Sequence, residues 1–249
     1  MVLAVLVAVG AGAGYRWLRS PRLTPELRGH AIAQELGCFA CHGPGATGGV
    51  ANPGSEENEV PAWDGGNAMM YVKNEGEIRE WILFGHPLRE ENEDSTHSHD
   101  ADEHDGELIE MPAFEGLVAG RRLEDLIAYY KAVAKFGPMP EGAREGYRVA
   151  RQNGCFGCHG PGGLVGTHNP GSFKRYIPPW RGRDYSELVK SDAELRGWIL
   201  DGGIERLESN PIARFFIGRQ IIDMPAYRDR LTDREADALV SYITWLQQR

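Results

Sequence analysis

Apolar residues recur with a helical period in several segments of the chain. Thr24 followed by Pro25 is typical of a helix start, and the pattern predicts a helix from there to about Leu36. Five further segments have the spacing of amphipathic helices: 77–84, 122–135, 141–152, 194–200 and 233–248. Long glycine-rich stretches separate them. The pattern therefore predicts a mainly α protein.

The helix starts differ in strength. Thr232 and Glu235 form a capping box before the last helix, in which each side chain bonds the other residue's backbone. Gly120 and Arg121 stand at the corresponding place before the helix over 122–135. We therefore expect that earlier helix to begin less firmly.

The chain also repeats itself. At an offset of 117 residues, three strings recur: Asn52-Pro53-Gly54-Ser55 as Asn169-Pro170-Gly171-Ser172, Pro61-x-Trp63 as Pro178-x-Trp180, and the helix over 77–85 as that over 194–202. At an offset of 113, Met111-Pro112-Ala113-Phe114 recurs as Met224-Pro225-Ala226-Tyr227. The repeat predicts two tandem domains, 21–136 and 137–249, joined by a Pro- and Gly-containing linker over 136–140.

The first 20 residues differ from the rest. Residues 1–14 carry no charge, and Tyr15, Trp17 and Arg19 follow them, as at a membrane interface. Fourteen helical residues span about 21 Å, less than the roughly 30 Å of a bilayer core, so the length is marginal. We expect residues 1–20 to be a hydrophobic membrane anchor. A cleaved signal peptide is the alternative.

The net charge of −9 comes from one segment. Residues 90–107 hold nine Asp and Glu and no Lys or Arg, which equals the net charge of the whole chain. No basic patch of the kind that binds nucleic acid is visible, so we exclude nucleic acid as a partner. His97, His99 and His104 lie in the segment. It is a solvated insertion, a weak Zn²⁺ or Cu²⁺ site, or a docking surface for a basic redox partner.

The strongest chemical signal is a pentapeptide that occurs twice and uses all four cysteines. Cys38-Phe39-Ala40-Cys41-His42 and Cys155-Phe156-Gly157-Cys158-His159 are C-x-x-C-H, the attachment signature of c-type haem. Cys38, Cys41, Cys155 and Cys158 would form thioethers, and His42 and His159 would be the proximal ligands of iron. The sequence predicts two covalently bound haem c groups.

Other interpretations of these cysteines explain less. A zinc site needs further Cys or His ligands at set spacing, and a thioredoxin-like pair does not need a histidine in both copies. Disulfides would leave the histidines unexplained.

Met111 and Met224 are the candidates for the sixth ligand. Each lies between the haem motif and the last helix of its repeat, and each precedes a proline that stiffens the loop. A thioether is soft and favours Fe(II), so His/Met ligation raises the reduction potential. The alternative is that both methionines fill a core.

Other methionines and histidines fit a ligand role less well. Met69 and Met70 have no counterpart in the second copy, and His86 and His168 are each unmatched. His30 aligns with Tyr147, which favours an aromatic packing position.

Together these residues resemble the class I cytochrome c fold in tandem, over about residues 24–136 and 140–249. The resemblance implies that the first helix of each copy crosses the last through Gly29 or Gly146, facing Tyr129 or Tyr242. It implies that the carbonyls of Pro44 and Pro161 accept a hydrogen bond from the haem histidines, which raises their basicity. Trp63 and Trp180, with the haem edge, are expected to hold the loops.

By this resemblance the chain is similar to diheme cytochromes such as cytochrome c4, or to the diheme subunit of a membrane respiratory complex. We expect an electron carrier or electron-transfer subunit, not an enzyme. It would pass single electrons between a respiratory or photosynthetic donor complex and an acceptor, on the periplasmic face of a bacterial cytoplasmic membrane. The alternative is a diheme enzyme, a peroxidase or a thiosulfate-oxidising cytochrome, with one labile axial position.

Overall fold

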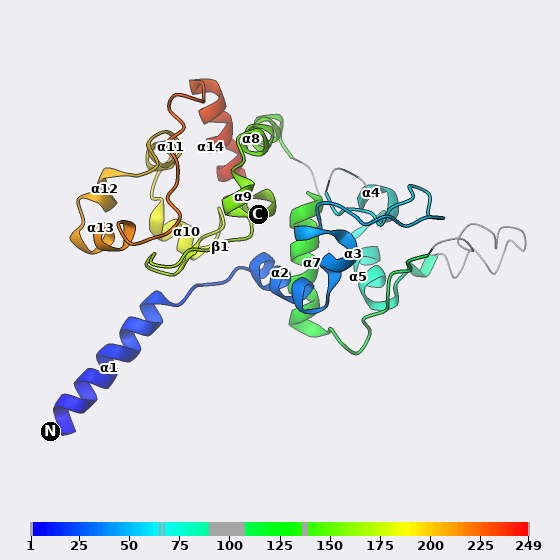
Figure 1. Cartoon of the computed structure of the whole chain (residues 1–249), viewed down its shortest axis with the longest axis horizontal. Coiled ribbons are helices and arrows are strands. Elements are labelled where there is room, and N and C mark those ends of the chain that lie inside the picture. Colours follow the sequence, from blue (N-terminus) through cyan, green and yellow to red (C-terminus); the bar gives the residue numbers. More distant parts are fainter. Residues whose placement is uncertain (1, 65, 67, 90–107, 136–138, 249) are drawn as a thin grey trace, which may run out of the picture. The chain divides into compact units, whose positions relative to one another are not determined.

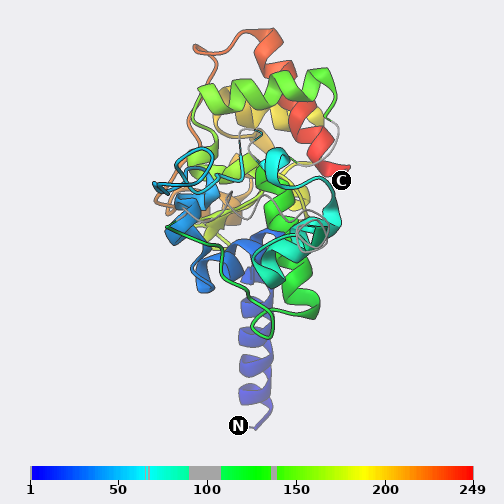
Figure 2. The ribbon, with the colours of Figure 1, turned by 90° about the vertical axis from the view of Figure 1, so that its right-hand side faces the viewer.

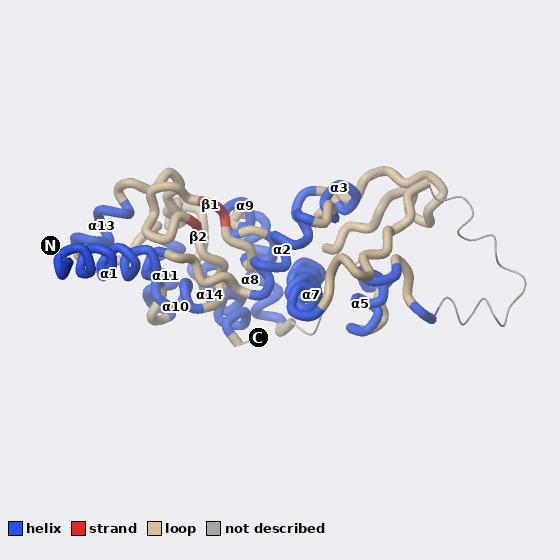
Figure 3. The backbone as a smooth tube through the Cα atoms, turned by 90° about the horizontal axis from the view of Figure 1, so that it is seen from below, coloured by secondary structure: helices blue, strands red, loops and turns tan. Residues whose placement is uncertain are grey.

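The structure is a computed structural model that describes residues 2–64, 66, 68–89, 108–135 and 139–248. Helices and loops make up nearly all of these residues, and the strands among them form one short pair (Figure 3). The chain divides into two compact units (Figure 1). We call Thr24–Pro138 the first unit, and Met139–Arg249 together with Met1–Leu23 the second unit.

The first unit is helical, as predicted. Its described elements are α2 (Pro25–Glu35), α3 (Cys38–His42), the 3-10 turn η1 (Pro44–Ala46), α4 (Ala68–Tyr71), α5 (Glu75–Phe84) and α7 (Gly120–Ala134). The side chain of Thr24 accepts a hydrogen bond from the Leu27 amide at 3.3 Å, so α2 begins where the sequence predicts. Ala119 precedes α7 without a side-chain cap, which confirms the weaker start expected there.

The second unit repeats this order and adds to it. Its elements are α1 (Val2–Arg19), α8 (Glu141–Gln152), α9 (Phe156–His159), the 3-10 turn η2 (Pro161–Gly163), β1 (Thr167–His168), β2 (Tyr176–Ile177), α10 (Arg183–Leu188), α11 (Asp192–Asp201), α12 (Glu205–Glu208), α13 (Pro211–Ile217) and α14 (Asp233–Gln247). The capping box of Thr232 and Glu235 is present. The sequence pattern missed α10, α12 and α13, because each is only one or two turns long.

A helix crossing forms the core of the first unit. A Cβ atom on Gly29 of α2 would lie 1.9 Å from the carbonyl oxygen of Asp125 in α7 and 2.7 Å from the Cβ of Tyr129. Only glycine allows so close an approach. The next residue, His30, packs edge-on against the Tyr129 ring at a centroid distance of 5.2 Å. The predicted crossing and the aromatic role of His30 are confirmed.

The second unit has the same crossing between α8 and α14 (Figure 2). A Cβ atom on Gly146 would lie 1.9 Å from the Ala238 carbonyl oxygen and 2.6 Å from the Cβ of Tyr242. Tyr147 packs edge-on against Tyr242 at 5.6 Å. The glycine and the aromatic residue after it therefore have the same roles in both units.

The N-terminal segment forms the helix α1. Within the described ranges, no helix combines the length and the apolar character that crossing a membrane requires. The end of α1 bonds to the second unit: Arg19 Nε donates to the Phe173 carbonyl at 2.7 Å, and the Arg22 amide donates to Asp184 at 2.8 Å. These bonds join the end of this segment to the second unit, and the predicted anchor over 1–20 stays a prediction.

Two predictions concern residues that the structure does not describe. His97, His99 and His104 of the acidic segment lie outside the described residues, as does most of the expected linker over 136–140. The interpretations of the acidic segment therefore stay open.

Candidate functional site

Each C-x-x-C-H motif lies on a single helical turn. Cys38 and Cys41 belong to α3, while Cys155 caps α9 and Cys158 lies within it. Three residues apart on a helix, the two thiols of a motif project from the same side. All four cysteines are free and half-buried.

The thiols lie in apolar surroundings. Burial raises the pKa of Cys38, and it raises the pKa of Cys155 to about 11. A reactive redox thiol needs a lowered pKa instead. Among the described residues, no three His, Cys, Asp or Glu side chains gather as a metal site. The zinc and thioredoxin-like interpretations are therefore not supported.

His42 is oriented by the loop that follows its motif. Its Nδ1 donates to the Pro61 carbonyl at 2.7 Å. Burial lowers the pKa of His42, while the Pro61 carbonyl acts in the opposite direction. The imidazole is therefore neutral with its proton on Nδ1, which leaves the Nε2 lone pair free for iron.

The prediction that Pro44 accepts this bond is wrong. The Pro44 carbonyl belongs to the turn η1 and accepts hydrogen bonds from Thr47, from the hydroxyl at 3.0 Å and from the amide at 3.4 Å. The carbonyl beside the imidazole comes instead from Pro61, 19 residues after His42.

His159 is the corresponding histidine of the second unit. Burial lowers the pKa of His159 to about 4, and the Pro178 backbone raises it by a smaller amount. Nδ1 of His159 makes no hydrogen bond of normal geometry within the described residues. Pro178 is the counterpart of Pro61, whereas the Pro161 carbonyl accepts from the Leu164 amide at 3.2 Å. The prediction for Pro161 is therefore also wrong.

The two predicted tryptophans pack against these histidines. The Trp63 ring lies 5.3 Å from His42, and the Trp180 ring lies 4.8 Å from His159, centroid to centroid. Both tryptophans are buried. The Trp63 amide donates to Ala46 at 2.9 Å, and the Trp180 amide donates to Gly163 at 2.7 Å. Each tryptophan therefore joins the loop after its motif to the motif histidine.

The crossing tyrosines also hold these loops. Tyr129 donates its hydroxyl to the Gly45 carbonyl at 2.9 Å, and Tyr242 donates to the Gly162 carbonyl at 2.9 Å. Because both tyrosines belong to the helix crossing, the crossing fixes the turn that follows each C-x-x-C-H motif.

Both methionine loops are fixed to the preceding helix in the same way. A Cβ atom on Gly85 would lie 2.3 Å from the Met111 carbonyl oxygen, and one on Gly202 would lie 2.4 Å from that of Met224. Three residues after each methionine, the aromatic amide donates back to the helix, from Phe114 to Ile82 O at 3.1 Å and from Tyr227 to Ile199 O at 3.2 Å. The backbones presenting Met111 and Met224 therefore match.

A buried asparagine holds the other side of each loop, and the sequence analysis missed this role. Asn52 receives the Ile109 amide at 2.9 Å and donates to the Ile109 carbonyl at 3.0 Å. Asn169 donates to the Ile222 carbonyl at 2.9 Å and accepts from the amides of Ile221 and Ile222 at 3.1 and 3.0 Å. Ile109 and Ile222 each lie two residues before the methionine. The repeated Asn-Pro-Gly-Ser string was the available signal.

The residues present fit a covalent haem in each unit. Each unit offers two free thiols on one turn, a buried neutral imidazole beside them, and a constrained loop that carries a methionine. The rejected candidates lie elsewhere: Met70 is 53% exposed and His168 is also exposed. The roles of Met111 and Met224 as sixth ligands stay a prediction.

Comparison with known protein families gives one match. Residues 141–243 match the model of the family described as cytochrome C oxidase, cbb3-type, subunit III. The matched segment is less than half of the chain and runs from α8 into α14. The match supports a class I cytochrome c domain over these residues, and that family implies a covalently bound haem c. Neither the comparison with curated proteins nor that with solved structures gave a match.

Proposed function

We propose that the protein is a diheme c-type cytochrome that transfers single electrons between a respiratory or photosynthetic donor complex and an acceptor. The observation that carries the proposal is the agreement of the two units, residue by residue, around each C-x-x-C-H motif. The first unit repeats the glycine–tyrosine crossing, the tryptophan and the fixed methionine loop of the domain that matches a cytochrome family.

When bound, haem c supplies the one-electron couple, and the protein supplies ligands and a shielded pocket. Cys38, Cys41, Cys155 and Cys158 would hold the two groups covalently. His42 and Met111 would ligate the iron of one group, and His159 and Met224 that of the other. Trp63 and Trp180 exclude water from the histidine side, since both are buried against the imidazoles.

The proposal extends to partners and location. Haem c is attached outside the cytoplasm in bacteria, so the expected site of action is the periplasmic face of the cytoplasmic membrane. The side chains of Leu6, Val7 and Val9 on α1 are more than half exposed. They are the surface that we propose for contact with the membrane. The redox partners would be membrane complexes or soluble carriers, and the matched family supports a role with a respiratory complex.

The first test is a redox titration of the purified protein, with CO added to the reduced form. A pyridine haemochrome assay should give two haems per chain. Two low-spin haems at positive potential that do not bind CO would support the proposal. Rapid, stoichiometric CO binding to one ferrous haem would overturn it in favour of the diheme enzyme.

Variants assign the axial positions. Met111→Ala should open one haem to CO and lower its potential, and Met224→Ala should do the same to the other. Met70→Ala is the matched control, because Met70 is exposed and has no counterpart in the other repeat. Wild-type CO behaviour in Met111→Ala or Met224→Ala would exclude that methionine as a ligand.

A further inference from the structure

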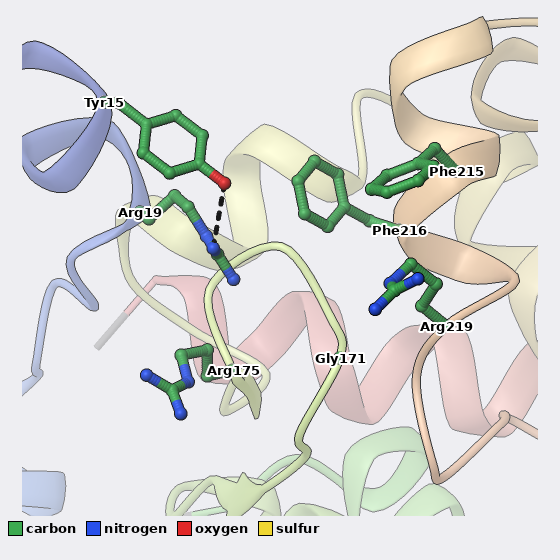
Figure 4. Close-up of a pocket in the computed structure, with 7 residues that line it drawn as sticks. All are labelled: Tyr15, Arg19, Gly171, Arg175, Phe215, Phe216 and Arg219. Atoms are coloured by element: carbon green, nitrogen blue, oxygen red, sulfur yellow. Dashed lines mark hydrogen bonds between the residues drawn. The ribbon is translucent and has the colours of Figure 1, made fainter. Parts of the chain in front are cut away.

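A second site lies in the second unit where the end of α1 meets α13. It is a cavity of ≈ 450 Å³, and its lining residues come from three separate stretches of the chain: Tyr15, Arg19, Gly171, Arg175, Phe215, Phe216 and Arg219 (Figure 4). None of the haem-motif residues lines it. Its function is therefore separate from that of the haem sites.

The cavity is strongly cationic. Three of its lining residues are arginines and none is acidic. Among the described residues, neither Arg175 nor Arg219 forms an ion pair with a carboxylate. The acids of α10 are already engaged, since Asp184 and Glu187 both pair with Lys174. Arg175 and Arg219 therefore remain available to an external anion.

One wall of the cavity is preorganised. Arg19 donates to the Tyr15 hydroxyl at 2.9 Å and to the Phe173 carbonyl at 2.7 Å, which holds its guanidinium in place. Both guanidinium groups also lie over aromatic rings: that of Arg219 is 5.3 Å from the centre of the Phe215 ring, and that of Arg19 is 5.2 Å from the centre of the Phe216 ring. A planar guanidinium fixed in this way suits two-point recognition of a phosphate.

Arg175 has a backbone conformation that its residue type disfavours. Its φ is +66°, in the left-handed region, where Asn is tolerated and Arg is not favoured. The equivalent residue of the first unit is Asn58, with φ +56°. The second unit thus keeps the same turn but places a long cation on it. Backbone strain of this kind is found preferentially at functional sites.

Two features bring Arg219 to this turn. Gly171 has φ +87°, and a Cβ atom there would lie 1.8 Å from the Arg219 carbonyl oxygen. The Ile221 amide donates to the Pro170 carbonyl at 3.1 Å. The chain after α13 therefore packs tightly against the turn that carries Arg175.

The opposite side of the site is apolar. Phe215 is 57% exposed and packs edge-on against Phe216. The apolar side chains of α1 are exposed as well, and Trp17 near its end lies under the guanidinium of Arg22 at 5.0 Å. Trp, Tyr and Arg at the end of an apolar helix are typical of a membrane interface. The three arginines therefore lie beside exposed apolar side chains of α1 and α13. This combination suits a phosphate group that carries acyl chains.

We propose that this cavity binds the phosphate of an anionic phospholipid headgroup, with Arg19, Arg175 and Arg219 as its cationic ligands. This site goes beyond the proposed electron transfer, although the turn that carries Arg175 also contains Asn169, which holds the Met224 loop. Inorganic phosphate has the same recognition chemistry, so the test separates the two sources.

The test measures partition of the full-length holoprotein into vesicles of phosphatidylcholine alone and into vesicles that also contain phosphatidylglycerol. The readout is the ratio of the two partition coefficients, because α1 alone contributes to both. Arg175→Gln with Arg219→Gln should lower this ratio about thirtyfold, given the usual effect of two cations at an anionic membrane. Arg151→Gln with Arg230→Gln is the control, since it removes the same charge from exposed sites outside the cavity.

Three results would overturn the proposal. The first is a wild-type ratio near one. The second is an equal loss in the control, which would mean unspecific attraction by charge. The third is displacement of the protein from anionic vesicles by millimolar inorganic phosphate at constant ionic strength, which would assign the cavity to a soluble phosphate. A redox titration of the Arg175→Gln, Arg219→Gln variant should match that of wild type. A negative result with the vesicles would therefore count against lipid binding and not against electron transfer.

Discussion

The two units have the same framework and differ in what they add to it. Both have a glycine–tyrosine crossing, a tryptophan against the motif histidine, and an asparagine that holds the methionine loop. They differ in the stretch before the methionine: the first unit has the acidic segment over 90–107, and the second has α12 and α13. The shared features therefore all surround the C-x-x-C-H motif or the methionine loop.

The crossings themselves also differ. In the first unit Arg28 of α2 donates two hydrogen bonds to Asp125 of α7, at 2.6 and 2.7 Å. In the second unit Glu145 and Ala238 stand at those positions, and no such pair exists there. The crossing thus depends on close backbone contact at glycine, while the ion pair beside it is optional.

Breaking one crossing should have the largest effect. Gly146→Ala places a Cβ atom 1.9 Å from the Ala238 carbonyl, so we expect a loss of at least about 3 kcal/mol in the second unit. Urea unfolding followed by far-UV circular dichroism and by Soret absorbance measures it. Gly142→Ala in the same helix is the control, because its nearest neighbour would be 3.9 Å away. It should stabilise by about 0.5–1 kcal/mol. Equal stability of the two variants would mean that close contact between α8 and α14 does not require glycine at position 146.

Removing the asparagines should have the next largest effect, and it tests whether the two methionine loops are held in the same way. Asn169→Ala deprives three backbone groups of a partner and Asn52→Ala deprives two, so we expect losses of about 2–3 and 1–2 kcal/mol. The freed methionine loop should also make CO binding to the ferrous haem measurable in each variant. Destabilisation without any CO binding would mean that the asparagines stabilise the loop but do not control the axial ligand.

Much of this framework could be predicted from the sequence. Helical periodicity and the capping box of Thr232 located the long helices, and the repeat identified the methionine loops. The resemblance to the class I cytochrome c fold added the crossing at Gly29 and Gly146. These features are local, or they recur at a fixed offset, so one sequence is sufficient to find them.

The missed features depend on contacts between distant residues. The partner of His42 is the Pro61 carbonyl, and no local pattern tells which of two prolines a loop brings to the imidazole. Asn169 acts on residues 52 and 53 positions away. The arginine cavity joins α1, one turn and the end of α13, which no spacing rule connects.

The pH-dependent contribution of Asp184 belongs to the second unit alone. Burial would raise the pKa of Asp184, but hydrogen bonds from the Arg22 amide, Lys174 and Tyr176 together hold it below its usual value. A carboxyl whose pKa is lowered by folding stabilises the protein above its unfolded pKa of about 3.9, and this stabilisation is lost as the pH falls through the folded value. The first unit has Asn67 at the equivalent position.

Asp184→Asn tests this difference. At pH 7 the variant should be about 1–2 kcal/mol less stable than wild type, because charge-assisted hydrogen bonds are lost. Below about pH 4 the gap should narrow, since wild type loses the same stabilisation. Urea midpoints measured between pH 3 and 7 provide the comparison. A gap that stays constant with pH would mean that the charge of Asp184 does not stabilise the fold. Asp201→Asn, at a solvent-exposed ion pair, is the control and should change little.

The smallest expected effect is an increase in stability. Arg175→Asn places in the second unit the residue that the first unit has at the same left-handed position, and relief of backbone strain should stabilise it by about 1 kcal/mol. The reciprocal Asn58→Arg should destabilise the first unit by a similar amount. If the cavity binds phosphate, Arg175→Asn should also weaken partition into anionic vesicles. A gain in stability joined to a loss of binding is the expected result where strain is retained for function. A gain in stability with unchanged binding would leave the strain of Arg175 without that explanation.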